Sequence, residues 1–160
     1  MRFKVLSMFA AVLLLAACET ASDQSANTAG QGGAGAGQTT RCTGCQEDLV
    51  ATVGDRIFFD FDKSNVKQEA RKTVEAWAAY LKRYPNVSAT IEGHCDERGT
   101  REYNIALGER RATAAKNALV AQGIDAKRLS TISYGKERPA VVGSNEAAWS
   151  QNRRAVLVIN

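Results

Sequence analysis

Apolar residues recur at intervals of three and four residues in two long segments of the chain, 68–84 and 101–121. That spacing places them on one face of an α-helix. The apolar or small positions are Ala70, Val74, Trp77 and Leu81 in the first segment, and Ile105, Gly108, Ala112, Ala115 and Leu119 in the second. Pro85 and Gly123 follow the two segments, where such residues end helices. The pattern therefore predicts two long helices.

Four shorter segments have the length and the apolar content of β-strands. They span residues 56–61, 87–92, 129–134 and 154–159. Apolar and polar residues alternate along 87–92, which predicts a strand with one buried face. A short helix is expected over 145–150, just before the last strand.

The predicted order of elements is β-α-β-α-β-(short α)-β. Strands separated by helices indicate a sheet with helices packed on it, of the α/β class in the broad sense, or α+β. The last strand has no long helix before it, and parallel strands need such a crossover, so we expect a mixed sheet. The predicted architecture is a two-layer sandwich of a mixed four-stranded sheet and two long helices.

The first seventeen residues have a different pattern, because Arg2 and Lys4 precede an apolar run from Val5 to Ala17. A charged start, a short apolar core and small residues at its end are the layout of a secretory signal peptide. The run is too short for a membrane-spanning helix, which needs ~20 residues. Its end, Leu-Ala-Ala-Cys, looks like the lipidation motif of bacterial lipoproteins. We therefore expect a signal peptide over 1–17 and, on Cys18, a thioether-linked diacylglycerol with an amide-linked acyl chain such as palmitate.

Residues 19–40 consist mainly of Ala, Ser, Thr, Asn, Gln and Gly, and such a composition offers too little to bury. We expect 18–48 to form a lipidated N-terminus and a flexible tether, and 49–160 to form one folded domain. A Gly-rich coil of about 22 residues spans roughly 25 Å. Glu19 follows the cysteine in place of the Asp that retains lipoproteins in the inner membrane of enteric bacteria. The expected location is the inner leaflet of the outer membrane, facing the periplasm.

The net charge of the chain is +4, and two of its positive charges lie in the predicted signal peptide. Acidic and basic residues are interleaved in the remainder, and no basic block is present. Proteins that bind nucleic acids need such a concentration of positive charge to neutralise phosphates. Nucleic acid is therefore not an expected partner.

Three cysteines follow Cys18 in the sequence. Cys42 and Cys45 have the spacing CxxC, whereas Cys95 lies in a later polar segment. Export places them in an oxidising compartment, where disulfides form. A local structural disulfide between Cys42 and Cys45 is one interpretation, and a zinc site that they share with His94 and Cys95 is the other.

Polar residues concentrate in the segment 93–100, in the loop expected between the second strand and the second long helix. Loops after strands commonly hold ligands in open sheets. Asp96 lies in this loop, and Asn104, Leu107 and Arg111 share one stripe of the following helix. A carboxylate and a guanidinium held apart can bind a zwitterion, with Asp96 taking an ammonium and Arg111 a carboxylate. The alternative is a structural ion pair between Asp96 and Arg111.

The same segment contains residue types found in enzymes, but catalysis is not expected. His94 is the only histidine in the chain. Consecutive residues of an extended segment point to opposite sides, so His94 and Cys95 should not face each other. The motifs HExxH and GxSxG are absent, and no second His or Cys accompanies His94 at metal-ligand spacing. We expect no metal, and no cofactor beyond the covalent lipid.

Over residues 53–160 the chain resembles the OmpA-like peptidoglycan-binding family. Five segments in the same order along the chain carry the resemblance: FDFDKS at 59–64, GHCDERGT at 93–100, YNIALGERRA at 103–112, SYGKERP at 133–139 and NRRAV at 152–156.

The resemblance implies noncovalent binding of the peptide stem of peptidoglycan, and above all of its meso-diaminopimelate residue. The side chain of that residue ends in an ammonium and a carboxylate. The family's ligand aspartate matches Asp96, and its arginine matches Arg111. Asn104 and Leu107 match walls of the pocket, and Asp62, in the loop after the first strand, is a further contact.

The resemblance also implies that the protein links the outer membrane to the cell wall and acts with the Tol system, notably TolB, in envelope integrity and cell division. An alternative is a protein–protein adaptor of the Tol system with weak affinity for the wall. One position departs from the family, because Cys95 stands where Ala or Thr is expected.

Overall fold

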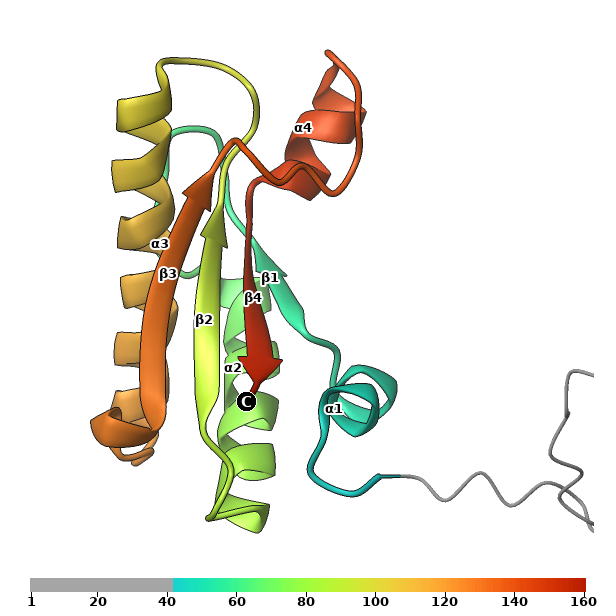
Figure 1. The fold of residues 1–160 in the computed structure, drawn as a ribbon, viewed down its shortest axis with the longest axis vertical. Helices are drawn as coiled ribbons and strands as arrows, with labels where there is room; N and C mark the ends of the chain where they lie inside the picture. Colours follow the sequence, from blue (N-terminus) through green and yellow to red (C-terminus); the bar gives the residue numbers. More distant parts are fainter. Residues whose placement is uncertain (1–41) are drawn as a thin grey trace, which may run out of the picture. The chain divides into compact units, whose positions relative to one another are not determined.

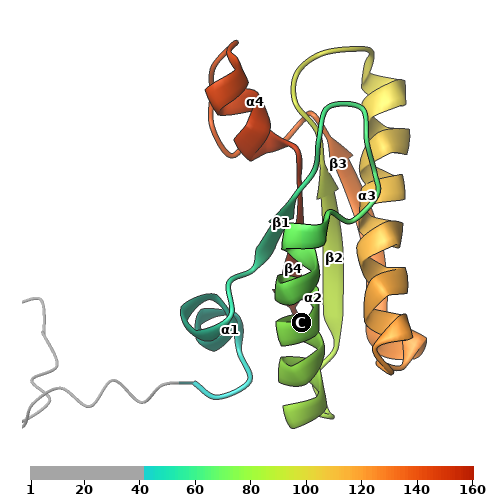
Figure 2. The same cartoon turned by 180° about the vertical axis from the view of Figure 1, so that it is seen from behind.

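The computed structural model describes residues 42–160, which fold as two layers (Figure 1). One layer is a four-stranded sheet, and the other consists of the long helices α2 (Gln68–Arg83) and α3 (Arg101–Ala121). Figure 2 shows both helices in front of the same face of the sheet. The predicted signal peptide, the predicted lipid attachment at Cys18 and residues 19–41 of the predicted tether lie outside the described residues.

The sheet is mixed, and its strands are ordered β1-β4-β2-β3. β2 (Ala89–His94) lies parallel to β3 (Leu129–Gly135), and α3 forms the crossover that connects them. β4 (Arg154–Ile159) follows the short helix α4 (Glu146–Asn152) and runs antiparallel to both β2 and β1 (Arg56–Phe58). The predicted two-layer α/β (α+β) architecture with a mixed four-stranded sheet is thereby confirmed.

The hydrophobic core lies between the sheet and the two long helices. Trp77 and Leu81 of α2, Leu119 of α3, Ile91 of β2 and Leu157 of β4 are fully buried. Alternate residues of each strand point toward the helices, as the pleat requires. Because burial of one large apolar side chain contributes roughly 1.5–3 kcal/mol, these contacts fix both helices to one face of the sheet.

A short helix, α1 (Gln46–Thr52), precedes β1 and was not predicted. Leu49 is fully buried, and the side chain of Gln46 donates to the carbonyl of Leu157 at 3.2 Å and accepts from the N–H of Ile159 at 2.8 Å. The predicted boundary between tether and domain, at 48 and 49, is therefore too late in the sequence. A seven-residue helix with one buried residue has no periodic apolar pattern that could indicate it.

The other elements begin and end close to their predicted bounds. β1 ends at Phe58 instead of residue 61, because the chain leaves the sheet after Phe59, whose N–H donates to the carbonyl of Arg153 at 2.9 Å. A 3₁₀ turn, η1 (Ala126–Arg128), leads into β3. Within residues 42–160, no helix is long and apolar enough to cross a membrane.

β2 and α3 approach each other most closely at two glycines. A Cβ atom added to Gly93 would lie 1.9 Å from the carbonyl oxygen of Gly108, and one added to Gly108 would lie 2.3 Å from the Oγ of Ser133. Neither position can hold a larger residue without separating the helix from the sheet. This contact sets the distance between the end of β2 and the first turns of α3.

His94, the last residue of β2, is only 1 % exposed. It alternates with Gly93, which faces α3, so its side chain points to the other face of the sheet. Its ring lies 5.5 Å from that of Tyr134, and neither ring nitrogen has a hydrogen-bond partner within residues 42–160. The nearest carboxylate oxygen, on Glu92, is 3.4 Å from Nε2. Burial, with a smaller contribution from the positive charge of Arg154, lowers the pKa of His94 to about 4. The imidazole is therefore neutral at pH 7.

Replacement of Gly93 by Ala should destabilise the fold by about 1–3 kcal/mol or more, because the new methyl group overlaps backbone atoms of α3. Urea unfolding followed by circular dichroism measures this. Gly54→Ala measures the cost of positive φ alone, about 1–2 kcal/mol, since the added Cβ meets no neighbouring atom. A smaller loss of stability in Gly93→Ala, where φ is not positive, than in Gly54→Ala would contradict the close approach of β2 and α3.

His94 should make the fold less stable in acid. The unfolded chain protonates it near pH 6.5, whereas the folded chain resists protonation down to about pH 4, so stability is full above pH 6.5 and is lost as the pH falls toward 4. The loss attributable to His94 is about 3 kcal/mol at most. Urea unfolding of the wild type and of His94→Gln at several pH values gives the free energy of unfolding of each protein as a function of pH. The loss due to His94 is the change with pH in the difference between these two curves. Parallel curves would show that His94 is not protected from protonation.

Candidate functional site

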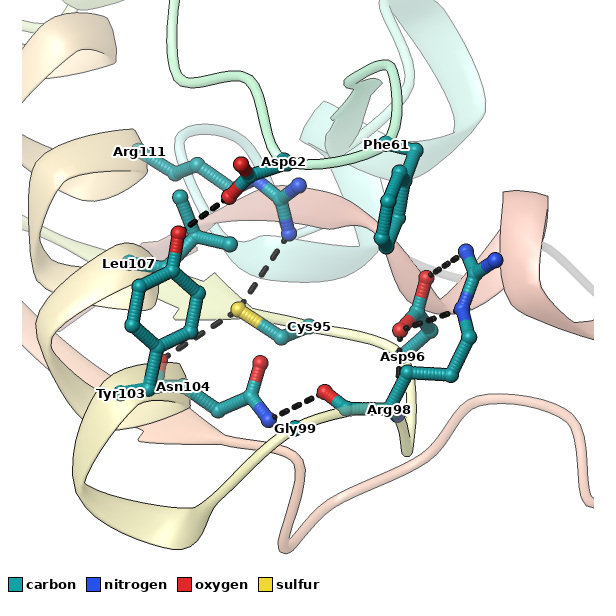
Figure 3. Close-up of a pocket in the computed structure, with 10 residues that line it drawn as sticks. All are labelled: Phe61, Asp62, Cys95, Asp96, Arg98, Gly99, Tyr103, Asn104, Leu107 and Arg111. Atoms are coloured by element: carbon teal, nitrogen blue, oxygen red, sulfur yellow. Dashed lines mark hydrogen bonds and ion pairs between the residues drawn. The ribbon is translucent and has the colours of Figure 1, made fainter.

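A cavity of about 210 Å³ lies where the loop after β1, the loop after β2 and the start of α3 meet. Figure 3 shows the ten residues that line it. All five residues predicted to contact a ligand are among them: Asp62 from the first loop, Asp96 from the second, and Asn104, Leu107 and Arg111 from α3. The structure therefore brings the predicted residues together in one place.

Arg111 is only 1 % exposed, and its guanidinium faces the cavity beside Asp62 (Figure 3). Its Nε donates to the carbonyl of Lys63 at 2.9 Å, and its Nη2 donates to the carbonyl of Asp60 at 3.1 Å. Its Nη1 donates to the carbonyl of His94 at 2.8 Å and to the Sγ of Cys95 at 3.3 Å.

All four of these acceptors are uncharged. Within residues 42–160, no carboxylate oxygen lies within ion-pair distance of the Arg111 guanidinium, and no acceptor meets its fifth N–H group, on Nη2. Burial lowers the pKa of Arg111, but an arginine stays charged in proteins. Among the described residues, this buried positive charge at the cavity therefore has no negative partner in direct contact.

Asp96 lines another wall of the cavity and is almost fully buried. Arg98 donates to its Oδ1 through the backbone N–H and through Nε, both at 3.2 Å, and to its Oδ2 through Nη2 at 2.6 Å. Arg153 donates to Oδ2 through Nη1 at 3.3 Å. Burial acts to raise the pKa of Asp96, but the hydrogen bonds from Arg98 and Arg153 outweigh it and lower the pKa. The carboxylate is ionised at neutral pH.

The predicted alternative of a structural ion pair between Asp96 and Arg111 is not found among the described residues, because Asp96 pairs with Arg98 and Arg153 instead. The two groups belong to separate walls of the cavity (Figure 3). The expectation of a carboxylate and a guanidinium held apart agrees with this geometry, but the two cationic partners of Asp96 were not predicted.

Asn104 and Leu107 complete the wall formed by α3. The Nδ2 of Asn104 donates to the carbonyls of Arg98 at 2.8 Å and Thr100 at 3.0 Å, which fixes the loop after β2 to the start of the helix. Its oxygen points into the cavity (Figure 3). Leu107 contributes an apolar surface next to Arg111.

Asp62 lies at the exposed rim of the cavity. It is the one residue other than glycine with positive φ, 56°, in the described part of the chain, a conformation that Asp tolerates better than most residues. The hydroxyl of Tyr103 donates to its carboxylate, and this bond raises the pKa of Tyr103. The bond connects the loop after β1 to the first turn of α3.

Among the lining residues that sequence reasoning did not assign to the site are three with large side chains, Phe61, Arg98 and Tyr103. Phe61 and Tyr103 are large aromatic residues that are 57 % and 45 % exposed, and each is a direct neighbour of a predicted residue in sequence. An aromatic residue next to a predicted ligand residue was therefore the feature of the sequence that could have indicated them. Arg153, which binds Asp96 from 57 positions away, had none.

Cys95 is a free, buried thiol on the floor of the cavity. It donates to the carbonyl of Asn104 at 3.4 Å and accepts from Arg111. Burial raises its pKa to about 11, so it is a protonated thiol at neutral pH and a poor nucleophile. His94 packs against Tyr134 instead of the cavity, so the two neighbours face opposite sides, as predicted.

Cys42 and Cys45 form a disulfide just before α1, and Cys45 is the N-cap residue of that helix. The interpretation of a local structural disulfide therefore agrees with the structure. α1 lies at the opposite end of the sheet from the tip of β2, where His94 is located (Figure 1). The predicted alternative of a zinc site shared with His94 and Cys95 is wrong, because the two pairs of residues are at opposite ends of the fold and the sulfurs of one pair are bonded together.

Comparisons with known proteins agree with the fold and the motifs. The model of the OmpA family matches residues 58–153. The peptidoglycan-associated lipoprotein of Agrobacterium fabrum is 51 % identical over 92 % of this chain and 82 % of its own length. That of Brucella melitensis is 53 % identical over 84 % of this chain and 79 % of its own length.

A crystal structure of the peptidoglycan-associated lipoprotein from Burkholderia pseudomallei has the same fold. It is 42 % identical, covers 66 % of this chain and 90 % of its own, and superposes with a TM-score of 0.65. These relatives are named as lipoproteins associated with peptidoglycan and not as enzymes, in agreement with the expectation that the protein is not an enzyme. The chain belongs to the OmpA family, and it is similar over most of its length to the peptidoglycan-associated lipoproteins named above.

Proposed function

We propose that the protein binds peptidoglycan noncovalently, with the side chain of meso-diaminopimelate inserted into the cavity at Arg111. The observation that carries the proposal is the buried Arg111 guanidinium, which has only uncharged acceptors and one unused N–H group. A buried charge without a partner is unfavourable by several kcal/mol. A ligand carboxylate supplies the missing charge and accepts from the free N–H group on Nη2.

The remaining walls suit the rest of the diaminopimelate side chain. Leu107 and Phe61 offer apolar surface to its methylene groups, and its ammonium would lie near the carboxylate of Asp96 and the oxygen of Asn104. The cavity combines one cationic and one anionic group, as recognition of a zwitterion requires. The names of the relatives, which are peptidoglycan-associated lipoproteins, support this choice of ligand.

The proposal extends to the predicted anchor. With two or more acyl chains on Cys18, the protein would be held stably in the inner leaflet of the outer membrane and would face the periplasm. The cavity would then bind the cell wall from the end of a short tether. Action with TolB and other Tol proteins in envelope integrity and cell division remains part of the proposal on the basis of family membership alone.

Replacement of Arg111 by Gln should reduce sedimentation of the full-length protein with purified peptidoglycan. The ligand carboxylate would lose a charged hydrogen-bond donor, which corresponds to roughly 1.5–3 kcal/mol or a tenfold or greater loss of affinity. Because Arg111 also holds the surrounding loops in place, its replacement alters the protein as well as the contact with the ligand. A second measurement therefore changes the ligand instead: the wild type should show the same loss when the side-chain carboxylate of diaminopimelate is amidated.

Arg128→Gln is the matched control for that experiment. Arg128 also donates to backbone carbonyls, those of Leu81, Tyr84 and Val87, but it lies just before β3, at the opposite end of the sheet from the cavity. Its variant should lose stability and still sediment with the wall. If Arg111→Gln sedimented as well as the wild type, or if amidation had no effect, the proposed site would be wrong.

Lipid attachment at Cys18 should be detectable in cells that are fed a clickable fatty acid. The wild type should incorporate the label and fractionate with the outer membrane, whereas Cys18→Ser should carry no label. Cys95→Ser provides a control for fatty acids bound to another thiol. Labelled Cys18→Ser protein would contradict the predicted attachment.

A further inference from the structure

Asp96 has no free acceptor position in this structure. A carboxylate offers about four lone-pair positions on its two oxygens. Oδ1 accepts from the backbone N–H and the Nε of Arg98, and Oδ2 accepts from the Nη2 of Arg98 and the Nη1 of Arg153. A ligand ammonium can therefore reach Asp96 only by displacing one of these donors.

The two guanidinium groups differ in how easily they can leave. The side chain of Arg153 is 7 % exposed, and it also donates to the carbonyl of Phe59 at 3.1 Å and to Glu146 at 2.5 Å. The side chain of Arg98 is 31 % exposed, and Asp96 accepts every side-chain hydrogen bond that it makes within residues 42–160. Arg98 is therefore the donor that a ligand can displace at lower free-energy cost.

The surroundings of Arg98 can accommodate its guanidinium after release. It lies between the rings of Phe61 and Trp149, with its Cζ 4.0 Å and 4.1 Å from the two ring centroids. The carboxylates of Glu146 and Glu97 are close enough to raise its pKa further, after the larger effect of Asp96. Aromatic faces and acidic neighbours both attract a cation, so the charge stays compensated when Arg98 leaves Asp96.

The backbone of Arg98 is held independently of its side chain. Its carbonyl accepts from the Nδ2 of Asn104 at 2.8 Å, and its N–H donates to Asp96. Displacement of the guanidinium therefore requires rotation about side-chain bonds and leaves the loop after β2 in place.

We propose that Arg98 is a specificity-determining residue that occupies the ammonium position on Asp96 in the free protein and is displaced there by the ammonium of the ligand. This inference rests on the proposed function and concerns the same cavity. The exchange replaces one cation on Asp96 by another, so the ammonium adds little net affinity while Arg98 is present. While no ligand is bound, Arg98 also supplies the buried carboxylate with a second cationic partner beside Arg153.

Isothermal titration of the full-length protein in detergent with two peptides tests the proposal. The first is the stem tripeptide L-Ala-γ-D-Glu-meso-diaminopimelate, and the second contains 2-aminopimelate instead, which keeps the side-chain carboxylate and lacks the ammonium. In the wild type the two affinities should differ only about twofold to threefold. In Arg98→Ala their ratio should rise by about tenfold, because Asp96 then has a free position for the ammonium. Arg98→Lys, which restores one cation without the bidentate geometry, should give an intermediate ratio.

Arg101→Ala is the matched control, since Arg101 is an exposed arginine at the start of α3 that pairs with Glu137 outside the cavity. Its ratio should equal that of the wild type, and circular dichroism should show that all variants are folded. An unchanged or smaller ratio in Arg98→Ala would overturn the displacement of Arg98 while leaving the proposed function intact. Failure of the wild type to bind either peptide would overturn the proposed function and this inference with it.

Discussion

The cavity depends on the hydrogen bonds that the buried guanidinium of Arg111 donates to the surrounding backbone. From α3 it donates to carbonyls of the loop after β1, at Asp60 and Lys63, and to the carbonyl at the end of β2, at His94. Three segments that are far apart in sequence therefore meet at one side chain. These acceptors hold the group in place without neutralising it, which leaves its charge available to a ligand. The close contact between Gly93 and Gly108 brings α3 near enough to the sheet for this arrangement.

Asp96 shows the complementary arrangement, since its negative charge is fully compensated within the chain. A series of ionic contacts runs from Arg98 through Asp96 to Arg153 and on to Glu146 at the start of α4. It connects the loop after β2 to the segment before β4. The free cavity thus offers an uncompensated cation on one wall and a compensated anion on another. A ligand carboxylate gains a new partner there, whereas a ligand ammonium must exchange with one that is already present.

Much of the fold could be predicted from the sequence, because the spacing of apolar residues and the order of helices and strands can be seen in short segments of it. The apolar spacing placed α2, α3 and the strands within a few residues, and the missing long helix before β4 predicted a mixed sheet. The predicted ligand residues also line one cavity. The pairing of Asp96 with Arg153 could not be predicted, because it joins residues 57 positions apart. The helix α1 could not be predicted either, because it is stabilised by contacts with β4, which lies more than 100 positions later in the sequence.

The central claim is that the Arg111 guanidinium binds a carboxylate of the wall peptide. A crystal structure of the protein with the stem tripeptide that contains meso-diaminopimelate tests it most directly. The account predicts the side-chain carboxylate of diaminopimelate at hydrogen-bond distance from Nη2 of Arg111, about 3 Å, with the carbonyls of Asp60, Lys63 and His94 still bound to the guanidinium. A peptide bound elsewhere, or one whose carboxylate points to solvent while Arg111 keeps only its present partners, would contradict it.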